Sequence, residues 1–228
     1  EGTVPFSVDK HIYDAVIFDL DGVVTQSAGV HFSAWKQMFD EFLKQQEGPD
    51  FSPFTEQDYR AYVDGMPRYD GVAKFLESRG IELPRGDPGD TPEQETICGL
   101  GNRKNRLFGE RLKSDGIKVY QESIEFIEDL RRAGIKTAIV SSSKNCPLVL
   151  EVAEATHLFD VRVDGNVSAE LGLSGKPDPD IFLEAAKELG VTPDRAIVVE
   201  DAIAGVQAGR RGGFGCVVGV DRTGDPES

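Results

Sequence analysis

Residues 18–25 read FDLDGVVT, and the apolar residues 15–18 before Asp19 have the β-branched content of a buried strand. Two carboxylates one residue apart, Asp19 and Asp21, therefore stand at the end of this strand. Their mutual repulsion favours a bound cation, and Mg²⁺ prefers such hard oxygen ligands. A carboxylate can also attack phosphorus and form an aspartyl phosphate. The alternative is an Asx-type turn that only ends the strand.

The rest of the chain alternates between strand and helix patterns. Further strands are predicted at residues 136–140, 159–163, 196–199 and 216–220, and helices at 121–133, 179–189 and 202–211. This alternation of strands and helices predicts an α/β fold with a doubly wound parallel sheet. Ligands bind beyond the carboxyl ends of the strands in such sheets, and Asp19 and Asp21 stand at one of these ends.

One long stretch after the first strand contains no convincing strand. Helices are predicted there at residues 31–46, 68–79 and 92–113, with loops rich in Pro, Gly and acidic residues at 47–54 and 80–92. We therefore expect a helical cap domain, residues 28–115, inserted into a Rossmann-like catalytic core formed by residues 1–27 and 116–228. The two connections between them are natural hinges.

Charge and composition narrow the classes of partner. The 228 residues carry a formal net charge of -15, which disfavours nucleic acid and anionic membrane surfaces. No apolar run approaches the roughly 18 residues that cross a membrane. Three cysteines, Cys98, Cys146 and Cys216, lack any CxxC spacing, so we expect buried free thiols and a reducing, cytoplasmic compartment. A monomer is compatible with these features.

Three further polar motifs follow predicted strands or precede a predicted helix. Ser141 follows the strand at 136–140, Lys176 lies in GKPDPD at 175–180, and Glu200 and Asp201 follow the strand at 196–199. Taken singly, each has a plain explanation: a helix N-cap, a surface lysine in a turn, and acids at a helix start. Together they offer a hydroxyl and amides for phosphoryl oxygens, a cation and an acidic pair for a metal.

These four motifs, in this order, resemble those of the haloacid dehalogenase superfamily of phosphotransferases. The resemblance spans nearly the whole chain. It implies that Asp19 is the nucleophile, that Asp21 is the general acid and base, and that Ser141 and Lys176 hold the transferring phosphoryl group. It also implies a Mg²⁺ site formed by the Asp19 carboxylate, the Asp21 backbone carbonyl, Asp201 and Glu200.

The cap stretch resembles the β-phosphoglucomutase family. The similar segments are HFSAWK at 31–36, GMPR at 65–68, RKN at 103–105 and, after the serines, KN at 144–145. The resemblance implies substrate contacts by His31, Trp35, Gly65, Arg68, Lys104, Asn105, Lys144 and Asn145. Arg68 suits a distal phosphate because a guanidinium offers two parallel donors. Core packing for Trp35, and packed or surface positions for the others, remain the alternatives.

The chain also departs from this family. Asp64 stands where members often have Lys, and Gln26 and Ser27 stand where they commonly have Asp and Thr, although Ser27 keeps a hydroxyl. The loop at 80–92 is unusually long and acidic. Family members usually continue with a further strand and helix beyond the point where this chain ends, so a longer or fused protein is one expectation.

The resemblance predicts an enzyme that interconverts β-D-glucose 1-phosphate and glucose 6-phosphate. It would work through an aspartyl phosphate and β-glucose 1,6-bisphosphate, with Mg²⁺ as cofactor and a sugar phosphate as its small-molecule partner. A sugar-phosphate phosphatase with the same nucleophile is the first alternative. A non-catalytic binding domain is the second, and the intact Asp19, Asp21, Lys176 and Asp201 argue against it.

Overall fold

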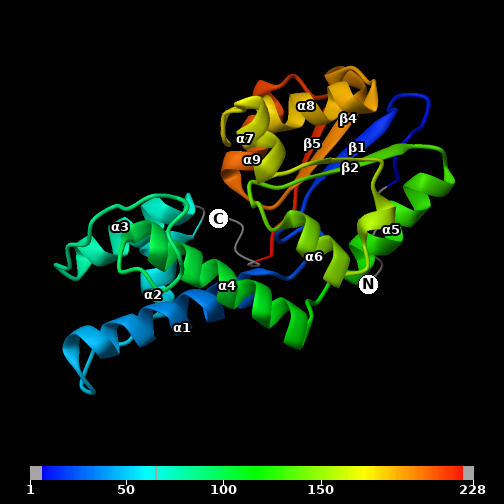
Figure 1. Cartoon of the computed structure of the whole chain (residues 1–228). Coiled ribbons are helices and arrows are strands. Elements are labelled where there is room, and N and C mark those ends of the chain that lie inside the picture. Colours follow the sequence, from blue (N-terminus) through cyan, green and yellow to red (C-terminus); the bar gives the residue numbers. More distant parts are fainter. Residues whose placement is uncertain (1–6, 65, 223–228) are drawn as a thin grey trace. The chain divides into compact units, whose positions relative to one another are not determined.

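The computed structural model describes residues 7–64 and 66–222 (Figure 1). The chain divides into two compact units, which are described separately below. The core unit runs up to Ser27 and resumes at Ile117, and the cap unit is Ala28–Gly116. Gly65, which the sequence placed in a substrate loop, lies outside the described residues.

The core unit contains a five-stranded sheet in the order β3-β2-β1-β4-β5, and every neighbouring pair is parallel. The strands are β1 (Ala15–Asp19), β2 (Lys136–Val140), β3 (Val161–Val163), β4 (Ala196–Glu200) and β5 (Cys216–Gly219). β1 lies between β2 and β4, with Ala15 in register with Lys136 and Ala196. The predicted doubly wound parallel sheet is therefore confirmed.

Helices cover both faces of this sheet (Figure 1). They are α5 (Gln121–Arg132), α6 (Cys146–Val152), α7 (Gly165–Leu171), α8 (Asp180–Leu189) and α9 (Ile203–Arg211), with short 3-10 turns at Thr156–Leu158 and Pro193–Arg195. Ile17 packs in one cluster with Phe182 of α8, whereas the ring of Phe18 lies 6.0 Å from that of Phe126 in α5. Successive strand residues point to opposite faces, so α8 and α5 lie on opposite sides.

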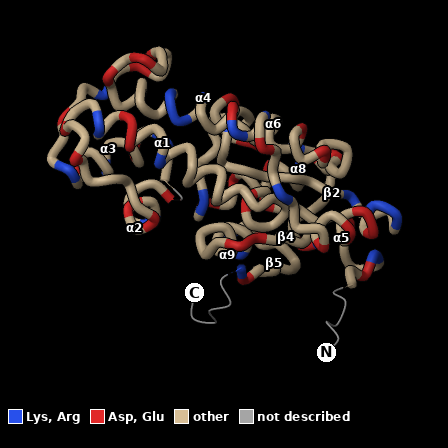
Figure 2. Tube along the Cα trace, turned by 90° about the horizontal axis from the view of Figure 1, so that it is seen from below, with Lys and Arg blue, Asp and Glu red and all other residues tan. Residues whose placement is uncertain are grey.

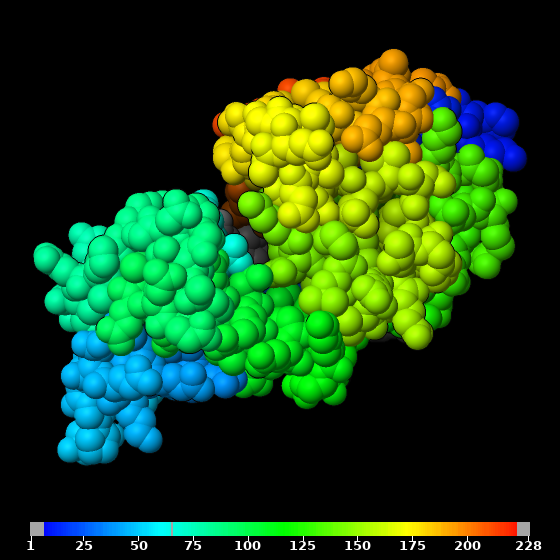
Figure 3. Space-filling model, viewed as in Figure 1, coloured from blue at the N-terminus to red at the C-terminus, as the bar shows by residue number. Residues whose placement is uncertain are grey.

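The core of this unit is buried as the apolar runs predict. Residues Ala15 to Phe18 of β1 are at most 1% exposed. In the space-filling view, the yellow and orange surface of the core unit comes from α7, α8 and their loops (Figure 3). Burial on both faces explains why the strand reads as a continuous apolar run instead of an alternating one.

The cap unit is helical among its described residues. Its elements are α1 (Ala28–Glu47), α2 (Glu56–Asp58), the π-helical turn Tyr59–Val63, α3 (Arg68–Ser78) and α4 (Ile97–Asp115). α1 packs along α4, and the rings of Phe39, Phe54 and Phe75 form an aromatic core with centroids 4.2–5.0 Å apart. The third predicted cap helix begins at Ile97 and not at residue 92, because Thr96 caps it by accepting a hydrogen bond from the Gly99 amide.

The loop between α3 and α4 is held by hydrogen bonds from α4. The Asn102 amide nitrogen donates to the carbonyls of Pro88 (3.0 Å) and Asp90 (2.9 Å), and Arg103 Nε donates to that of Pro92 (2.7 Å). The Tyr69 hydroxyl, at the start of α3, donates to the Asn102 side-chain oxygen at 2.8 Å. A segment that composition marked only as a loop is therefore fixed to α4, which is itself joined to α3 through Asn102.

Hydropathy, cysteine burial and the distribution of charge can be checked over all of the described residues. None of their helices is long and apolar enough to span a bilayer. All three cysteines are free, with Cys98 and Cys146 buried and Cys216 only half-buried, so the expectation of burial is wrong for Cys216. Acidic residues are spread over the helices of both units (Figure 2).

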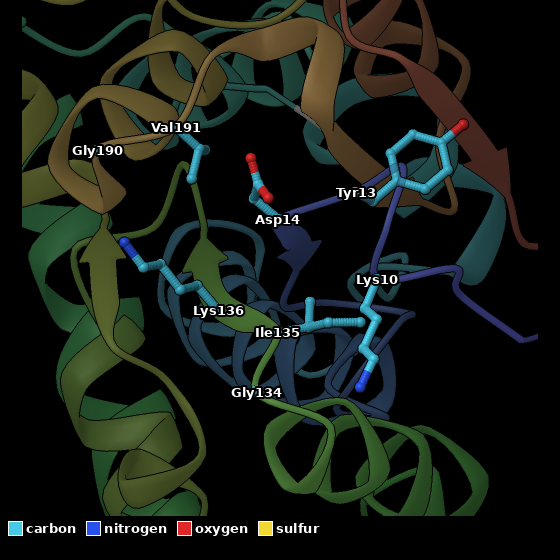
Figure 4. Close-up of a pocket in the computed structure, with 8 residues that line it drawn as sticks. All are labelled: Lys10, Tyr13, Asp14, Gly134, Ile135, Lys136, Gly190 and Val191. Atoms are coloured by element: carbon cyan, nitrogen blue, oxygen red, sulfur yellow. The ribbon is translucent and has the colours of Figure 1, made fainter.

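A hollow of about 250 Å³ opens at the amino-terminal edge of β1 and β2 (Figure 4). Lys10, Asp14, Lys136 and Val191 are among its lining residues. Asp14 already pairs with Arg195 at 2.7 Å, and Lys136 Nζ donates to the Leu189 carbonyl at 2.8 Å. Because the predicted reactive residues lie at the opposite edge of the sheet, this hollow is not the candidate site.

Candidate active site

Acidic side chains meet at the carboxyl-terminal edge of the sheet. Asp19 ends β1 and Glu200 ends the adjacent β4, with Asp201 directly after it. Each of the three offers a carboxylate oxygen, and these oxygens lie within 4.8 Å of one another. Asp19 and Glu200 are buried, whereas Asp201 is exposed. Parallel neighbouring strands bring their carboxyl ends together, so the topology produces this cluster directly.

Lys176 connects two of these carboxylates. Its ammonium lies 2.7 Å from Asp19 Oδ1 and 2.7 Å from Glu200 Oε2. Burial alone would lower the pKa of Lys176, but the two carboxylates raise it above its usual value. Lys176 is therefore charged at neutral pH and sits where it can neutralise charge on Asp19 and on any anion beside it.

One lysine does not balance the acidic cluster. Burial raises the pKa of Asp19 to about 8, an effect that Lys176 opposes and that Glu200 and Asp21 reinforce. Burial likewise raises the pKa of Glu200 and of Asp201 above their ordinary values. The site holds more negative charge than its own cation can compensate, so a further cation would be stabilising.

Two glycines let the acidic residues approach so closely. Gly22 has φ +80°, and a Cβ built on it would lie 1.8 Å from Asp201 Oδ2. A Cβ on Gly205, in α9, would lie 2.0 Å from Glu200 Oε2. Any larger residue would displace these carboxylates, so both glycines are part of the site's architecture. Gly22 lies within the motif at 18–25, whereas no pattern in the sequence indicates the role of Gly205.

Asp21 is oriented by buried hydroxyls. Ser27 Oγ donates a short hydrogen bond to Asp21 Oδ1, and Thr25 Oγ1 donates to Ser27 Oγ at 3.4 Å. Thr25 and Ser27 are fully buried. These two hydroxyls hold the Asp21 carboxylate in one orientation. The sequence showed only that Ser27 has a hydroxyl where family members commonly have Thr, and it did not indicate this contact.

Ser141 lies directly after β2 and is 1% exposed. Its backbone amide donates to the Val163 carbonyl at 3.1 Å, and its Oγ accepts from the Ser143 amide at 3.1 Å. Amide donors for a phosphoryl group at this loop would therefore come from neighbours of Ser141. Lys144 is exposed, and Asn145 directly precedes α6, with its amide donating to Ser143 Oγ at 3.0 Å.

In the cap unit, three of the predicted substrate residues converge. His31 and Trp35 lie one turn apart on α1, and Lys104 lies on the facing α4. The Lys104 ammonium is 3.0 Å from His31 Nδ1 and 5.0 Å from the centre of the Trp35 ring. Lys104 is 5% exposed, a rare burial for a lysine, and its charge faces aromatic rings.

Arg68, Trp35 and Asn105 differ in how they are placed in the cap unit. Arg68 begins α3, and its Nε is buried with no hydrogen-bond partner among the described residues. Trp35 is 4% exposed and its ring stacks on that of Phe39 at 5.4 Å, so it also packs in the cap core. Asn105 is half-buried on α4 next to Lys104.

The family model of the haloacid dehalogenase-like hydrolases matches residues 13–213. The chain belongs to this family. A β-phosphoglucomutase of Mycobacterium bovis is 49% identical over 214 residues, which cover 92% of this chain and 82% of the relative. A phosphorylated carbohydrates phosphatase of Thermotoga maritima is 30% identical over 210 residues, which cover 91% and 85%.

A solved β-phosphoglucomutase from Clostridium difficile has the same architecture. It matches with a TM-score of 0.67 at 27% identity, over 90% of this chain and 84% of the other. These comparisons confirm the expected superfamily, the α/β fold and membership of the β-phosphoglucomutase family within the haloacid dehalogenase-like hydrolases.

The ligand atoms of the acidic cluster, Asp19, Glu200 and Asp201, are of the type that binds a divalent cation. Its donors are hard carboxylate oxygens, which Mg²⁺ prefers. Glu200 has partners for both oxygens, because Oε2 accepts from Lys176 and Oε1 accepts from the amides of Asp201 and Ala202. Asp19 and the exposed Asp201 are therefore the most accessible of the three carboxylates for a metal ligand.

Proposed function

We propose that the protein is a Mg²⁺-dependent β-phosphoglucomutase, which interconverts β-D-glucose 1-phosphate and glucose 6-phosphate. The observation that carries the proposal is the 49% identity to the M. bovis β-phosphoglucomutase. The geometry adds support, since Lys176 lies 2.7 Å from Asp19, which belongs to the acidic cluster. Lys176 contacts two buried carboxylates, Asp19 and Glu200, and Glu200 already accepts hydrogen bonds at both of its oxygens. We therefore take Asp19 as the nucleophile.

In the first half-reaction, phosphorylated Asp19 donates its phosphoryl group to the C6 hydroxyl of β-glucose 1-phosphate. The bond between Asp19 and phosphorus breaks, and a bond from O6 to phosphorus forms. Asp21, oriented by Ser27, takes the proton from that hydroxyl. The product is β-glucose 1,6-bisphosphate.

In the second half-reaction, the bisphosphate has turned over so that its C1 phosphate faces Asp19. A carboxylate oxygen of Asp19 attacks phosphorus, the bond from O1 to phosphorus breaks, and Asp21 returns its proton to O1. Glucose 6-phosphate leaves and the phosphoenzyme is restored. Lys176 and Ser141 hold the transferring group throughout.

Mg²⁺ would be held by Asp19, Asp201, the backbone carbonyl of Asp21 and Glu200. When bound, it supplies positive charge beside the transferring phosphoryl oxygens. In the cap unit, Arg68 is proposed to bind the phosphate that is not being transferred, because its buried Nε has no acceptor among the described residues. His31, Trp35, Gly65, Lys104, Asn105, Lys144 and Asn145 are proposed as further substrate contacts.

Product analysis tests this proposal. The protein is incubated with β-glucose 1-phosphate, Mg²⁺ and a trace of β-glucose 1,6-bisphosphate. Glucose 6-phosphate formed without inorganic phosphate supports the mutase. Phosphate released in step with substrate loss supports a sugar-phosphate phosphatase, the function named for the T. maritima relative. No turnover of any kind would favour a binding domain.

An Asp19→Asn variant tests the covalent step. We expect it to lose both turnover and labelling by acetyl phosphate, which the intact mass reports. The matched control is Asp14→Asn, at the start of the same strand but at the opposite edge of the sheet. Normal turnover in Asp19→Asn would rule out the aspartyl phosphate.

A further inference from the structure

The turn that carries Asp21 is wound tightly on itself. The Leu20 carbonyl accepts hydrogen bonds from the amides of Val24 at 2.9 Å and Thr25 at 3.1 Å, and the Gly22 amide donates to the Thr25 carbonyl at 2.9 Å. These bonds satisfy the amides of the turn from within. The carbonyls of Gly22 and Val23 need donors from other segments.

Arg222, beyond the last strand, supplies such donors. Its Nε donates to the Gly22 carbonyl at 2.8 Å and its Nη2 donates to the Val23 carbonyl at 3.3 Å. Ser123 Oγ also donates to Val23, at 2.7 Å. One guanidinium therefore bridges two consecutive carbonyls, and its planar fork suits this better than the single ammonium of a lysine.

The guanidinium is itself held in place. It lies 3.5 Å from the centre of the Tyr120 ring, and its Nη1 is 3.2 Å from Glu122 Oε1. The Tyr120 amide in turn donates to the Val24 carbonyl at 2.9 Å. Arg222 thus lies between the turn and the segment that begins α5, and it makes four separate contacts.

Small movements of this turn would reach the acidic cluster. The Gly22 Cα packs so closely against Asp201 that a Cβ there would be 1.8 Å from Oδ2. Asp21 precedes Gly22, so a shift of the turn changes the position of the Asp21 carboxylate and of its backbone carbonyl. Catalytic geometry tolerates such shifts poorly, since about 1 Å of misplacement can cost about a hundredfold in rate.

We propose that Arg222 is a positioning residue for phosphoryl transfer, which fixes the turn bearing Asp21 against Asp201. The inference rests on the proposed function, in which Asp21 moves the proton. Arg222 touches no reacting atom in this account. It acts through the Gly22 and Val23 carbonyls.

The first test compares Arg222→Ala with Glu122→Gln. Arg222→Ala should lower kcat for β-glucose 1-phosphate by about ten- to a hundredfold, while KM changes far less. Glu122→Gln removes only the ion pair to a carboxylate that is 70% exposed, so its kcat should stay near that of the unmutated protein. An unchanged kcat in Arg222→Ala overturns the proposal.

The second test separates positioning from a loss of folded protein. The Arg222 side chain keeps 27% exposure, so free methylguanidine can reach the space left in Arg222→Ala. We expect methylguanidine to restore part of kcat without raising the melting temperature, and Arg222→Lys to keep an intermediate rate. If the rate loss equals the unfolded fraction and methylguanidine restores nothing, the role is purely structural.

A third measurement keeps the inference distinct from the proposed function. Asp19 is phosphorylated with acetyl phosphate, and the decay of the phosphoenzyme in water is followed by intact mass. Asp21 must take a proton from the attacking water, so Arg222→Ala should slow this decay even if the unmutated protein isomerises no glucose phosphate. Equal decay in both proteins overturns the positioning role alone. A chain that neither isomerises nor accepts phosphate overturns both.

Discussion

Lys176 carries a buried positive charge between two carboxylates, each 2.7 Å from its ammonium. Lys176→Met would leave Glu200, and Asp19 whenever it is ionised, without this counter-ion, and breaking a buried pair is costly. We expect a loss of about 3 kcal/mol in the free energy of unfolding, measured with urea at neutral pH without metal. Added Mg²⁺ should restore part of this loss. Lys144→Met, at an exposed lysine, should change stability by less than about 0.5 kcal/mol. Equal urea midpoints for the Lys176→Met and unmutated proteins would contradict this account.

Gly205 offers a sharper test of the site's packing. Gly205→Ala places a methyl group where the Glu200 carboxylate lies, so Glu200 must move away from Lys176. We expect a large loss of turnover together with a lower melting temperature. Gly29→Ala is the matched control, because a Cβ there meets nothing within 4 Å. As a helical glycine, Gly29 should give slightly higher stability when changed to Ala. Similar melting temperatures for the two variants would show that Glu200 moves at no cost.

At this scale the sequence predicts some contacts and not others. Asp19 and Glu200 could be placed together because they end strands of one parallel sheet, whose carboxyl ends share an edge. Lys176 precedes a helix, and only the resemblance to the superfamily placed it beside them. The bond from Ser27 to Asp21 and the close approach of Gly205 to Glu200 depend on distances between backbones. No periodicity or motif spacing encodes those distances.

Asn102 fixes an element that the sequence marked only as loop. Asn102→Ala removes two bonds to the loop carbonyls and one from the Tyr69 hydroxyl. We expect a loss of about 1–3 kcal/mol and faster amide hydrogen exchange across residues 86–92. Tyr69→Phe removes only the last of the three bonds, so its effect on exchange should be smaller. Unchanged exchange in Asn102→Ala would mean that the loop is held by its internal bonds alone.

The predicted elements were most accurate where the apolar pattern was distinct. All five strands of the sheet and the longer helices of the core unit were predicted, because a strand buried on both faces forms a continuous apolar run and an amphipathic helix has its own period. The helices α6 and α7 were missed because seven residues give too little of a period. Asn145 and Asp164 are their N-cap residues, and only Asp164 caps with its side chain, which accepts from the amides of Asn166 and Val167.

At the scale of the whole molecule, the net charge would disfavour anions, whereas the site is proposed to bind them. The chain has a formal net charge of -15, yet its proposed substrates are anions. Lys176 lies largely buried at the sheet edge, and Lys104 is buried in the cap unit. Both positive charges are therefore partly shielded from the acidic surface. Local cations in a water-poor setting can act against the overall field. The net charge of the chain therefore argues more strongly against nucleic acid, which contacts a wide surface, than against a small phosphate that fits beside one or two cations.

The same charge balance predicts how metal affects stability with pH. Without metal, folded Asp19 has a pKa of about 8 while the unfolded chain releases that proton near pH 4, so the folded state holds an extra proton between these values. Stability contributed by this proton is present at low pH and is lost as pH rises through 8. Mg²⁺ binds the anionic carboxylate, so it must displace the proton from nearly every molecule at pH 6 but from only about half of them at pH 8. We therefore expect the rise in melting temperature with Mg²⁺ to be larger at pH 8 than at pH 6. Thermal unfolding over a Mg²⁺ titration measures it, and Asp19→Asn should remove most of the difference. A shift independent of pH in the unmutated protein would place the metal away from Asp19.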